Sequence, residues 1–313
     1  MAKTQGAKLT ISPATICVVA NPKSGRNSKD RAAIEQAMAA FGPQATLRRW
    51  HKGDDLDAFV QKAVDDGFTT IVAAGGDGTV MGVAHALVGS QAQLGVLPLG
   101  TFNYFARGLG LPQEPEAAAR AILAGHPRRI SVGSVNGQLF LNNASVGIYP
   151  SILLAREAVY DRWGRSRALA HWSVLRTILK FQRPKRMVLT ADGTRIEMKT
   201  PLVFVARSAY QLERFGLQGA QAISDDQFAI FVARGGTRLH LLKTAVRLAL
   251  RSVSVGDDVD VIYARQLDIE TSRSRPLVAF DGEKRRMRGP LSFRIQSAAL
   301  SIIVPDEADK VAA

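Results

Sequence analysis

Cysteine is almost absent from this sequence of 313 residues, which contains only Cys17. One cysteine excludes a disulfide framework and a cysteine-rich metal site, and the apolar neighbours of Cys17 indicate a buried side chain. Long hydrophobic runs are absent as well, because no stretch of about eighteen apolar residues lacks a charge. Residues 1–10 do not contain the apolar core of a signal peptide. We therefore expect a soluble, cytoplasmic protein.

Two common nucleotide-binding motifs are also missing. The sequence has no GxxxxGK[ST], which excludes a Walker P-loop, and Met81 stands where the dinucleotide motif GxGxxG needs its last glycine. No cluster of histidine, cysteine and acidic residues has the spacing of a catalytic zinc site. A recognisable nucleic-acid-binding module is likewise absent, so we expect no nucleic-acid partner.

The charge of the chain is strongly one-sided. The 41 Lys and Arg exceed the 27 Asp and Glu, for a formal net charge of +14, which indicates an anionic partner such as a nucleotide or an acidic membrane surface. The stretch from Arg156 to Arg214 contains 13 Lys and Arg but 5 Asp and Glu, interleaved with aromatic residues such as Trp163 and Trp172. This composition suits peripheral contact with an anionic membrane, and it suits solvated helix faces equally well.

The first part of the sequence alternates between strand and helix patterns. These patterns are strands at 14–20, 45–50, 71–74 and 94–97, and helices at 28–41, 54–66, 80–88 and 116–123. Repeated strand–helix units predict a parallel sheet with helices on both faces. Ligands bind beyond the carboxyl ends of such strands. Three loops follow strand ends here: Asn21 to Gly25, Gly75 to Thr79 and Pro98 to Asn103.

After about residue 128 the sequence becomes mostly strands. Hairpins are predicted over 130–144 across Asn136-Gly137 and over 187–198 across Asp192-Gly193. Further strand patterns lie at 202–206, 228–232, 259–263, 267–270, 277–279 and 300–304, and helix patterns at 149–160, 166–181 and 238–251. We therefore predict an α/β domain over 1–128 and a mostly antiparallel β domain over 129–313, whose last residues are candidates to pack back on the first domain.

The most specific stretch is Gly75-Gly76-Asp77-Gly78-Thr79, which ends a buried strand and precedes a helix pattern. Glycines let the backbone approach a phosphate, and the first N–H groups of a helix attract an anion. Asp77 repels phosphate unless a metal or an acceptor hydroxyl group lies between them. The alternative is a simple turn whose glycines serve only the bend, but this run of five residues is too specific to favour it.

The loops taken together resemble the lipid kinase superfamily of diacylglycerol, ceramide and sphingosine kinases, and above all its soluble bacterial branch. The matching segments, in family order, are Asn21-Pro22 with Ser24-Gly25, Gly75 to Thr79, Pro98 to Asn103 with Phe105-Ala106-Arg107, Phe140 to Asn143 running to Gly147, and Asp281-Gly282-Glu283. GGDGT alone also occurs in NAD kinases. The PxGTxN and DGE elements are what make the resemblance specific to lipid kinases.

The resemblance implies an N-terminal nucleotide-binding domain of the NAD-kinase and diacylglycerol-kinase type, and a C-terminal β-sandwich-like domain for the lipid substrate. It implies ATP and Mg²⁺ as cofactors and transfer of the γ-phosphate to the hydroxyl group of a membrane lipid such as diacylglycerol. Contact with the inner membrane surface follows from the substrate, and a homodimer is left open. The implied nucleotide contacts are Asn21, Pro22, Ser24, Gly25, Gly75, Gly76, Asp77, Gly78, Thr79, Thr101 and Asn103.

The resemblance also implies roles for acidic residues. Asp281 is the expected general base, and Glu283 is expected to help hold Mg²⁺ or water. Asp77, the competing candidate for the base, is better placed among the phosphate-facing amides to orient metal or water. A structural Mg²⁺ is expected at Asp226, with the carbonyl groups of Ile223 and Phe228 as further ligands.

This sequence departs from the family pattern at two places beside the phosphates. Met81-Gly82 stands where Asn-Glu is usual, and Tyr104 stands where an aspartate is usual. These departures leave a catalytically silent protein that binds lipid or nucleotide as one alternative to a lipid kinase. The second alternative is an NAD kinase-like enzyme, because NAD kinases share GGDGT.

Overall fold

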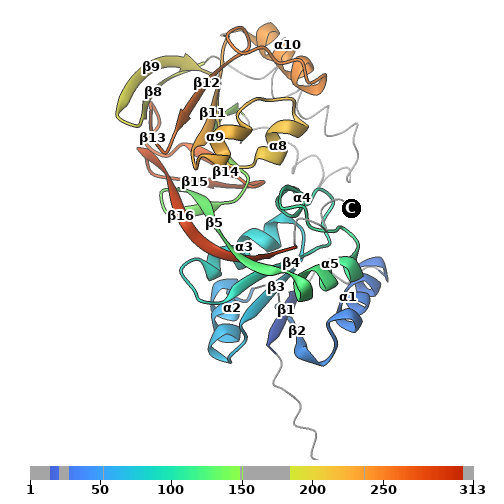
Figure 1. Ribbon diagram of the computed structural model, residues 1–313. Coiled ribbons are helices and arrows are strands. Elements are labelled where there is room, and N and C mark those ends of the chain that lie inside the picture. Colours follow the sequence, from blue (N-terminus) through green and yellow to red (C-terminus); the bar gives the residue numbers. More distant parts are fainter. Residues whose placement is uncertain are drawn as a thin grey trace, which may run out of the picture. The chain divides into compact units, whose positions relative to one another are not determined.

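The computed structural model describes residues 15–20, 28–51, 53–148, 150, 184–235 and 237–305. They form two compact units (Figure 1). The first unit comprises the chain up to Thr101, Leu111–Arg128 and the residues from Ser301 onward; the second comprises Phe102–Gly110 and Arg129–Leu300. The predicted helix over 166–181 lies outside the described residues, and so does that over 149–160 except for Pro150. Asn21, Pro22, Ser24 and Gly25 lie outside them as well.

A parallel sheet forms the centre of the first unit. Strand β1 (Ile16–Ala20) lies between β2 (Ala45–Arg49) and β3 (Thr70–Gly75), and β4 (Gln93–Pro98) pairs with β3; all these pairs are parallel. The end of β16 (Leu291–Val304) adds to β4 in parallel, with Ile302 opposite Leu94. Every residue of β1 and β3 is buried, as expected for strands covered on both faces.

Helices cover this sheet (Figure 1). They are α1 (Ser28–Phe41), α2 (Leu56–Asp65), α3 (Asp77–Leu87) and α5 (Pro115–Ala124). Apolar residues of α1 and α5 form one core with Ile16, Val18 and Ala20 of β1, while α2 packs against α3. The alternation of strands and helices predicted for this region is therefore confirmed.

The second unit is built from antiparallel strands in two sheets. One sheet has the order β12 (Val259–Ala264), β11 (Phe228–Ala233), β10 (Leu202–Ala206), β7 (Asn143–Gly147), β14 (Leu277–Phe280) and β15 (Glu283–Arg286). In the other, β16 pairs with β13 (Gln266–Thr271), which pairs with β8 (Lys185–Ala191), which pairs with β9 (Thr194–Thr200); β5 (His126–Val135) pairs with β16 and with β6 (Gln138–Phe140).

Aromatic rings join the two sheets of the second unit. The ring of Phe140 lies 5.9 Å from that of Phe228 in one sheet and 6.4 Å from that of Phe293 in the other, measured between centroids. All three side chains are almost completely buried. The predicted fold class, a parallel α/β domain with an antiparallel, sandwich-like second domain, is confirmed.

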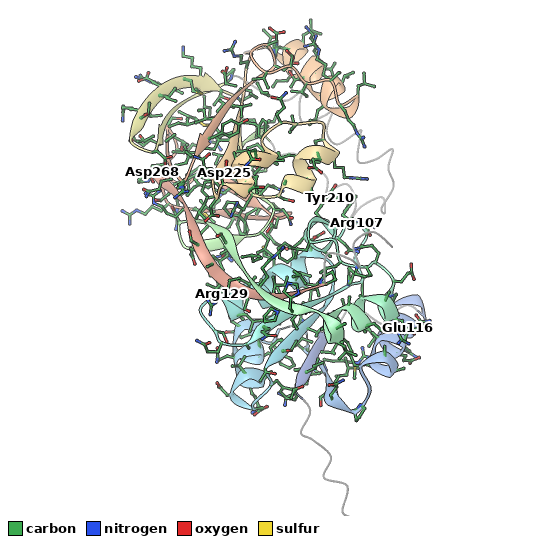
Figure 2. All side chains as sticks on the ribbon, in the orientation of Figure 1. Arg107, Glu116, Arg129, Tyr210, Asp225 and Asp268 are labelled. Atoms are coloured by element: carbon green, nitrogen blue, oxygen red, sulfur yellow. The ribbon has the colours of Figure 1, made fainter. Side chains whose placement is uncertain are left out.

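Three short helices and one longer one complete the described part of the second unit: α4 (Tyr104–Gly108), α8 (Ala209–Arg214), α9 (Ala220–Ser224) and the longer α10 (Arg238–Ala249). Helix α4 packs on α8, and a Cβ atom on Gly108 would lie 3.3 Å from Cβ of Tyr210. Figure 2 marks Arg107 and Tyr210 on these two helices. This packing groups Phe102–Gly110 with the second unit, whereas the sequence-based division assigned them to the first domain.

One predicted strand is wrong in its extent. The sequence predicted a single strand over 138–144, but β6 ends at Phe140 and β7 begins at Asn143 in the other sheet. The ladder is interrupted because the carboxylate of Asp281 accepts the backbone N–H groups of Leu141, Asn142 and Asn143. The strand predicted over 300–304 is in turn only the end of β16.

Candidate active site

The GGDGT segment forms a strand end and a helix start in the first unit. Strand β3 ends at Gly75, and α3 begins at Asp77 with Gly76 as its N-cap residue. The N–H groups of Thr79 and Val80 donate to the carbonyl oxygen of Gly76 at 2.9 and 3.1 Å. The amides of Asp77 and Gly78 therefore form the N-terminal turn of α3, where the helix dipole favours an anion.

The three glycines of this segment differ in what a side chain would contact at their positions. A Cβ atom on Gly75 would lie 2.5 Å from Oγ1 of Thr79, and one on Gly76 would lie 3.2 Å from Cα of Gly100. At Gly78, which is exposed, a Cβ atom would meet no heavy atom of the described residues within 4 Å beyond its own turn. Packing explains the first two glycines, while a side chain at Gly78 would enter open space among the described residues.

A second loop lies beside the first. The N–H group of Leu99 donates to the carbonyl oxygen of Gly75 at 2.9 Å, and Gly100 is in close contact with Gly76. Neighbouring parallel strands bring their carboxyl ends together, so the pairing of β3 with β4 brings the loop from Pro98 to Thr101 to the GGDGT segment. Thr101 is exposed there.

The unusual pair Met81-Gly82 serves the packing of helices. The side chain of Met81 is buried, and a Cβ atom on Gly82 would lie 2.6 Å from Cδ2 of Leu56 on α2. A side chain at position 82 would displace Leu56. Glycine at this position therefore permits the close contact between α2 and α3.

Asn103 and Tyr104 start helix α4 in the second unit. Asn103 is buried with φ at 49°, a left-handed conformation that asparagine tolerates, and its carbonyl oxygen accepts the N–H group of Arg107 at 2.9 Å. The ring of Tyr104 stacks on that of Phe102 with centroids 5.5 Å apart. Tyr104, where the family has an acid, thus forms an aromatic pair with a ring that is 58% exposed.

Asp281 occupies a tight turn between β14 and β15. Asp281 and Gly282 have φ values of 45° and 88°, as a type I′ hairpin turn requires. One carboxylate oxygen accepts the N–H group of Leu141 at 2.5 Å, and the other accepts those of Asn142 and Asn143 at 2.9 and 3.0 Å. These amides orient the carboxylate, and the carboxylate in turn fixes the loop from Leu141 to Asn143.

Glu283 lies directly after this turn. It is exposed and stands opposite Phe280 in the pairing of β14 with β15. The structure therefore brings Asp281 and Glu283 together at the same hairpin end. Asp77, the third acid expected in catalysis, belongs to the first unit.

A second Asp-Gly turn in the same unit has nearly the same construction. Asp192 and Gly193 have φ values of 44° and 85° between β8 and β9. The carboxylate of Asp192 accepts the N–H groups of Arg265 at 3.1 Å and Gln266 at 2.9 Å. The geometry of the turn alone therefore does not distinguish Asp281 from a structural aspartate.

The expected Mg²⁺ site at Asp226 is not suited to a metal ion. Its carboxylate is hydrogen-bonded to the guanidinium group of Arg207 and to two serines, and the carbonyl oxygen of Ile223 accepts from Arg207 at 2.9 Å. Phe228 begins β11, and its side chain is buried in the core. Within the described ranges, no group of three or more histidine, cysteine or acidic side chains could hold a metal ion.

Sequence reasoning missed Arg207, Ser131 and Ser297, which surround Asp226. Arg207 follows the apolar strand β10, and a lone arginine at the end of such a strand was the available signal, although it does not indicate the partner. The two serines come from strands distant in sequence, so no local pattern marks them.

Comparison with known proteins identifies the family. Residues 15–135 match the sequence model of the "Diacylglycerol kinase catalytic domain", and residues 153–304 match that of the "YegS C-terminal NAD kinase beta sandwich-like domain". The chain therefore belongs to the family of lipid kinases built from these two domains, and the resemblance seen in the sequence is confirmed.

Individual relatives agree with this assignment. A Pseudomonas aeruginosa (strain UCBPP-PA14) protein described as "Probable lipid kinase YegS-like" is 44% identical over 134 residues, which are 42% of this chain and 44% of that protein. A Bacillus subtilis (strain 168) protein described as "Diacylglycerol kinase" is 28% identical over 278 residues, 85% of this chain and 88% of its own. The similarity to the Pseudomonas protein thus spans less than half of that protein's length.

A solved structure shares the fold. The crystal structure of a diacylglycerol kinase from Bacillus anthracis str. Sterne aligns with a TM-score of 0.67 and 20% sequence identity, covering 94% of this chain and 97% of its own.

Proposed function

We propose that this protein is an ATP-dependent lipid kinase, which transfers the γ-phosphate of ATP to the hydroxyl group of a membrane lipid such as diacylglycerol. The observation that carries the proposal is the N-terminus of α3, which follows directly on the end of β3 at the GGDGT segment. Among the described residues a Cβ atom on Gly78 would meet open space there, and the Pro98–Thr101 loop lies alongside. Family membership favours a phosphate group as the occupant of this space.

The first unit binds the nucleotide in this proposal. The amides of the GGDGT segment and the N-terminus of α3 receive the phosphates, and the hydroxyl group of Thr101 is exposed beside them. The Mg²⁺ that accompanies ATP as part of the substrate offsets the phosphate charge. The carboxylate of Asp77 offers an oxygen ligand of the type that Mg²⁺ prefers.

Asp281 is the proposed general base. As the lipid hydroxyl oxygen forms its bond to the γ-phosphorus, the bond from that phosphorus to the bridging oxygen breaks and ADP leaves. The hydroxyl proton passes to the carboxylate of Asp281, which backbone amides hold in one orientation. Glu283 stands beside it at the same turn.

One experiment separates this function from its two alternatives. The purified full chain is incubated with γ-labelled ATP and Mg²⁺, in one arm with a mixed lipid extract in detergent and in the other with NAD. Label in the organic phase supports a lipid kinase, and label in NADP would instead support an NAD kinase-like enzyme. If neither acceptor is labelled while ATP still binds, a catalytically silent binding protein replaces the proposal.

We propose that the protein contacts an anionic membrane through the exposed face of helix α10. The inner side of this helix includes Leu241, buried in a cluster with Ile148, and Arg247 pairs at 2.8 Å with the buried Asp258. Leu239 and Leu250 lie on the opposite face and are 77% and 71% exposed.

The exposed face of α10 is both apolar and basic. Val246 lies between Leu239 and Leu250 at helical spacing and is 51% exposed, and Lys243 is exposed on the same face. Residues 238–251 contain no aspartate or glutamate. An amphipathic helix with cations and exposed leucines fits an anionic lipid surface. No helix within the described ranges has the length and apolar character needed to cross a membrane.

Exchange of Leu239 and Leu250 for serine should weaken binding to phosphatidylglycerol vesicles by about tenfold or more, because apolar area is lost from the contact. Vesicle co-sedimentation measures the effect, and binding of the wild type should fall as salt rises. Leu123→Ser on α5, another exposed leucine at 38%, is the control that should bind normally. Equal binding of wild type to neutral and anionic vesicles would contradict the assignment.

A further inference from the structure

The carboxylate of Asp226 is fully engaged by side chains of the second unit. One oxygen accepts from the guanidinium group of Arg207, and the other accepts from the hydroxyl groups of Ser131 and Ser297, each at 3.0 Å. Asp226 itself has φ at 61° and follows Asp225, which Figure 2 labels near the end of α9. The oxygens that a metal ion would need therefore already have hydrogen-bond donors.

Arg207 also binds the carbonyl group of Ile223, which was expected to be a second ligand of Mg²⁺. Its Nη1 atom donates to the carbonyl oxygen of Ile223 at 2.9 Å, while its Nη2 atom donates to Asp226. The side chain of Arg207 is 7% exposed. Burial lowers its pKa, while the charge and hydrogen bond of Asp226 act in the opposite direction. Its Nε atom is buried without a partner in the described part of the chain, so the two Nη groups determine its orientation.

We propose that the guanidinium group of Arg207 takes the place of a divalent cation at this site, so that the fold of the second unit does not depend on metal. A metal ion would need the same carboxylate and carbonyl oxygens at about 2.0–2.6 Å. It would then stand directly beside a buried arginine that remains charged in proteins, and the two cations would repel each other. Arg207 supplies a permanent charge and directed donors instead.

The contacts of Arg207 and Asp226 connect elements of both sheets. Arg207 follows β10, Ile223 is in α9 and Asp226 precedes β11, while Ser131 belongs to β5 and Ser297 to β16. The N–H group of Arg207 also donates to the carbonyl oxygen of Asn142 at 2.8 Å, in the loop that Asp281 holds. The arginine thus provides the cross-link between these elements that a bound cation would give.

Thermal unfolding of the full chain tests the proposal independently of kinase activity. The melting temperature of the wild type should be the same after treatment with EDTA and after addition of Mg²⁺, Ca²⁺ or Mn²⁺. Arg207→Ala should lower it by about 10 °C, because a half-buried carboxylate loses the buried guanidinium group that is its partner. Addition of Ca²⁺ or Mn²⁺ should then restore several degrees, because the vacated position exposes oxygen ligands to the metal.

Two further variants make the result specific. Arg234→Ala removes a more exposed partner of Asp260 in the same unit and should show no metal response. Arg207→Ala combined with Asp226→Asn should lose the restoration by metal. The proposal is overturned if EDTA destabilises the wild type, or if Arg207→Ala responds to metal no more than Arg234→Ala. If Arg207→Ala does not fold, the response of the wild type to EDTA decides the question.

Discussion

Turnover of Asp281→Asn should fall by about 10²–10⁴-fold, the usual contribution of a general base, with little change in the affinity for ATP. The variant lacks a carboxylate that can accept the hydroxyl proton of the lipid. Its amide NH₂ group would also face a backbone N–H group, because both oxygens of Asp281 accept from the loop of residues 141–143. A loss of stability of about 1–3 kcal/mol should therefore accompany the loss of turnover.

Asp192→Asn is the matched control for this effect. Asp192 lies in the same type of Asp-Gly turn and its carboxylate also accepts backbone N–H groups. The control variant should lose stability by a similar amount and keep its turnover. Steady-state kinetics on both variants, with their unfolding measured in urea, separates the two contributions. If the two variants lose turnover equally, Asp281 is a structural aspartate and the base is a different residue.

Gly78→Val should lower turnover and the affinity for ATP by about 10²-fold while the free energy of unfolding stays nearly unchanged. The branched side chain would occupy the open space at the N-terminus of α3 and hold a phosphate away from the helix amides. A displacement of about 1 Å at a reacting group can cost this much in rate. Valine and glycine differ little in helix propensity, so the helix itself should persist.

Substitution of the neighbouring Gly76 should change the free energy of unfolding, unlike substitution of Gly78. Gly76→Val should destabilise the fold, because the backbone of Gly100 lies 3.2 Å from the new Cβ atom. A loss of activity in that variant would therefore not identify the nucleotide site. Ala32→Val places the same side chain at an exposed position of α1 and should behave as wild type. Isothermal titration with ATP measures the affinities; normal ATP binding by Gly78→Val would remove the GGDGT segment from the site.

The parts of the fold set by local patterns could be predicted from the sequence. Buried β-branched runs and helix periodicity identified the strands and helices of the first unit, and the asparagine and aspartate that precede glycine marked tight hairpin turns, as at Asn136 and Asp192. The GGDGT segment could be placed at a helix N-terminus because a strand pattern precedes it and a helix pattern follows.

Such local patterns could not predict interactions between residues that are distant in the sequence. The break between β6 and β7 depends on Asp281, about 140 residues further along the chain. Helix α4 has only five residues and is stabilised by packing on α8, so its periodicity is too short to detect. Arg207 was missed because an arginine after an apolar strand carries no information about its partner Asp226.

The final strand has a consequence for how the chain reaches its native state. Ile302 pairs with Leu94, and a Cβ atom on Gly125 would lie 2.6 Å from the carbonyl oxygen of Val304. The sheet that begins with β1 is thus completed by residues synthesised about two hundred positions after β4. Until they emerge, β4 is an open sheet edge, and such edges promote aggregation of nascent chains. A fragment that ends near residue 128 should for the same reason be prone to aggregate, and closure of the first unit should be a late step of folding.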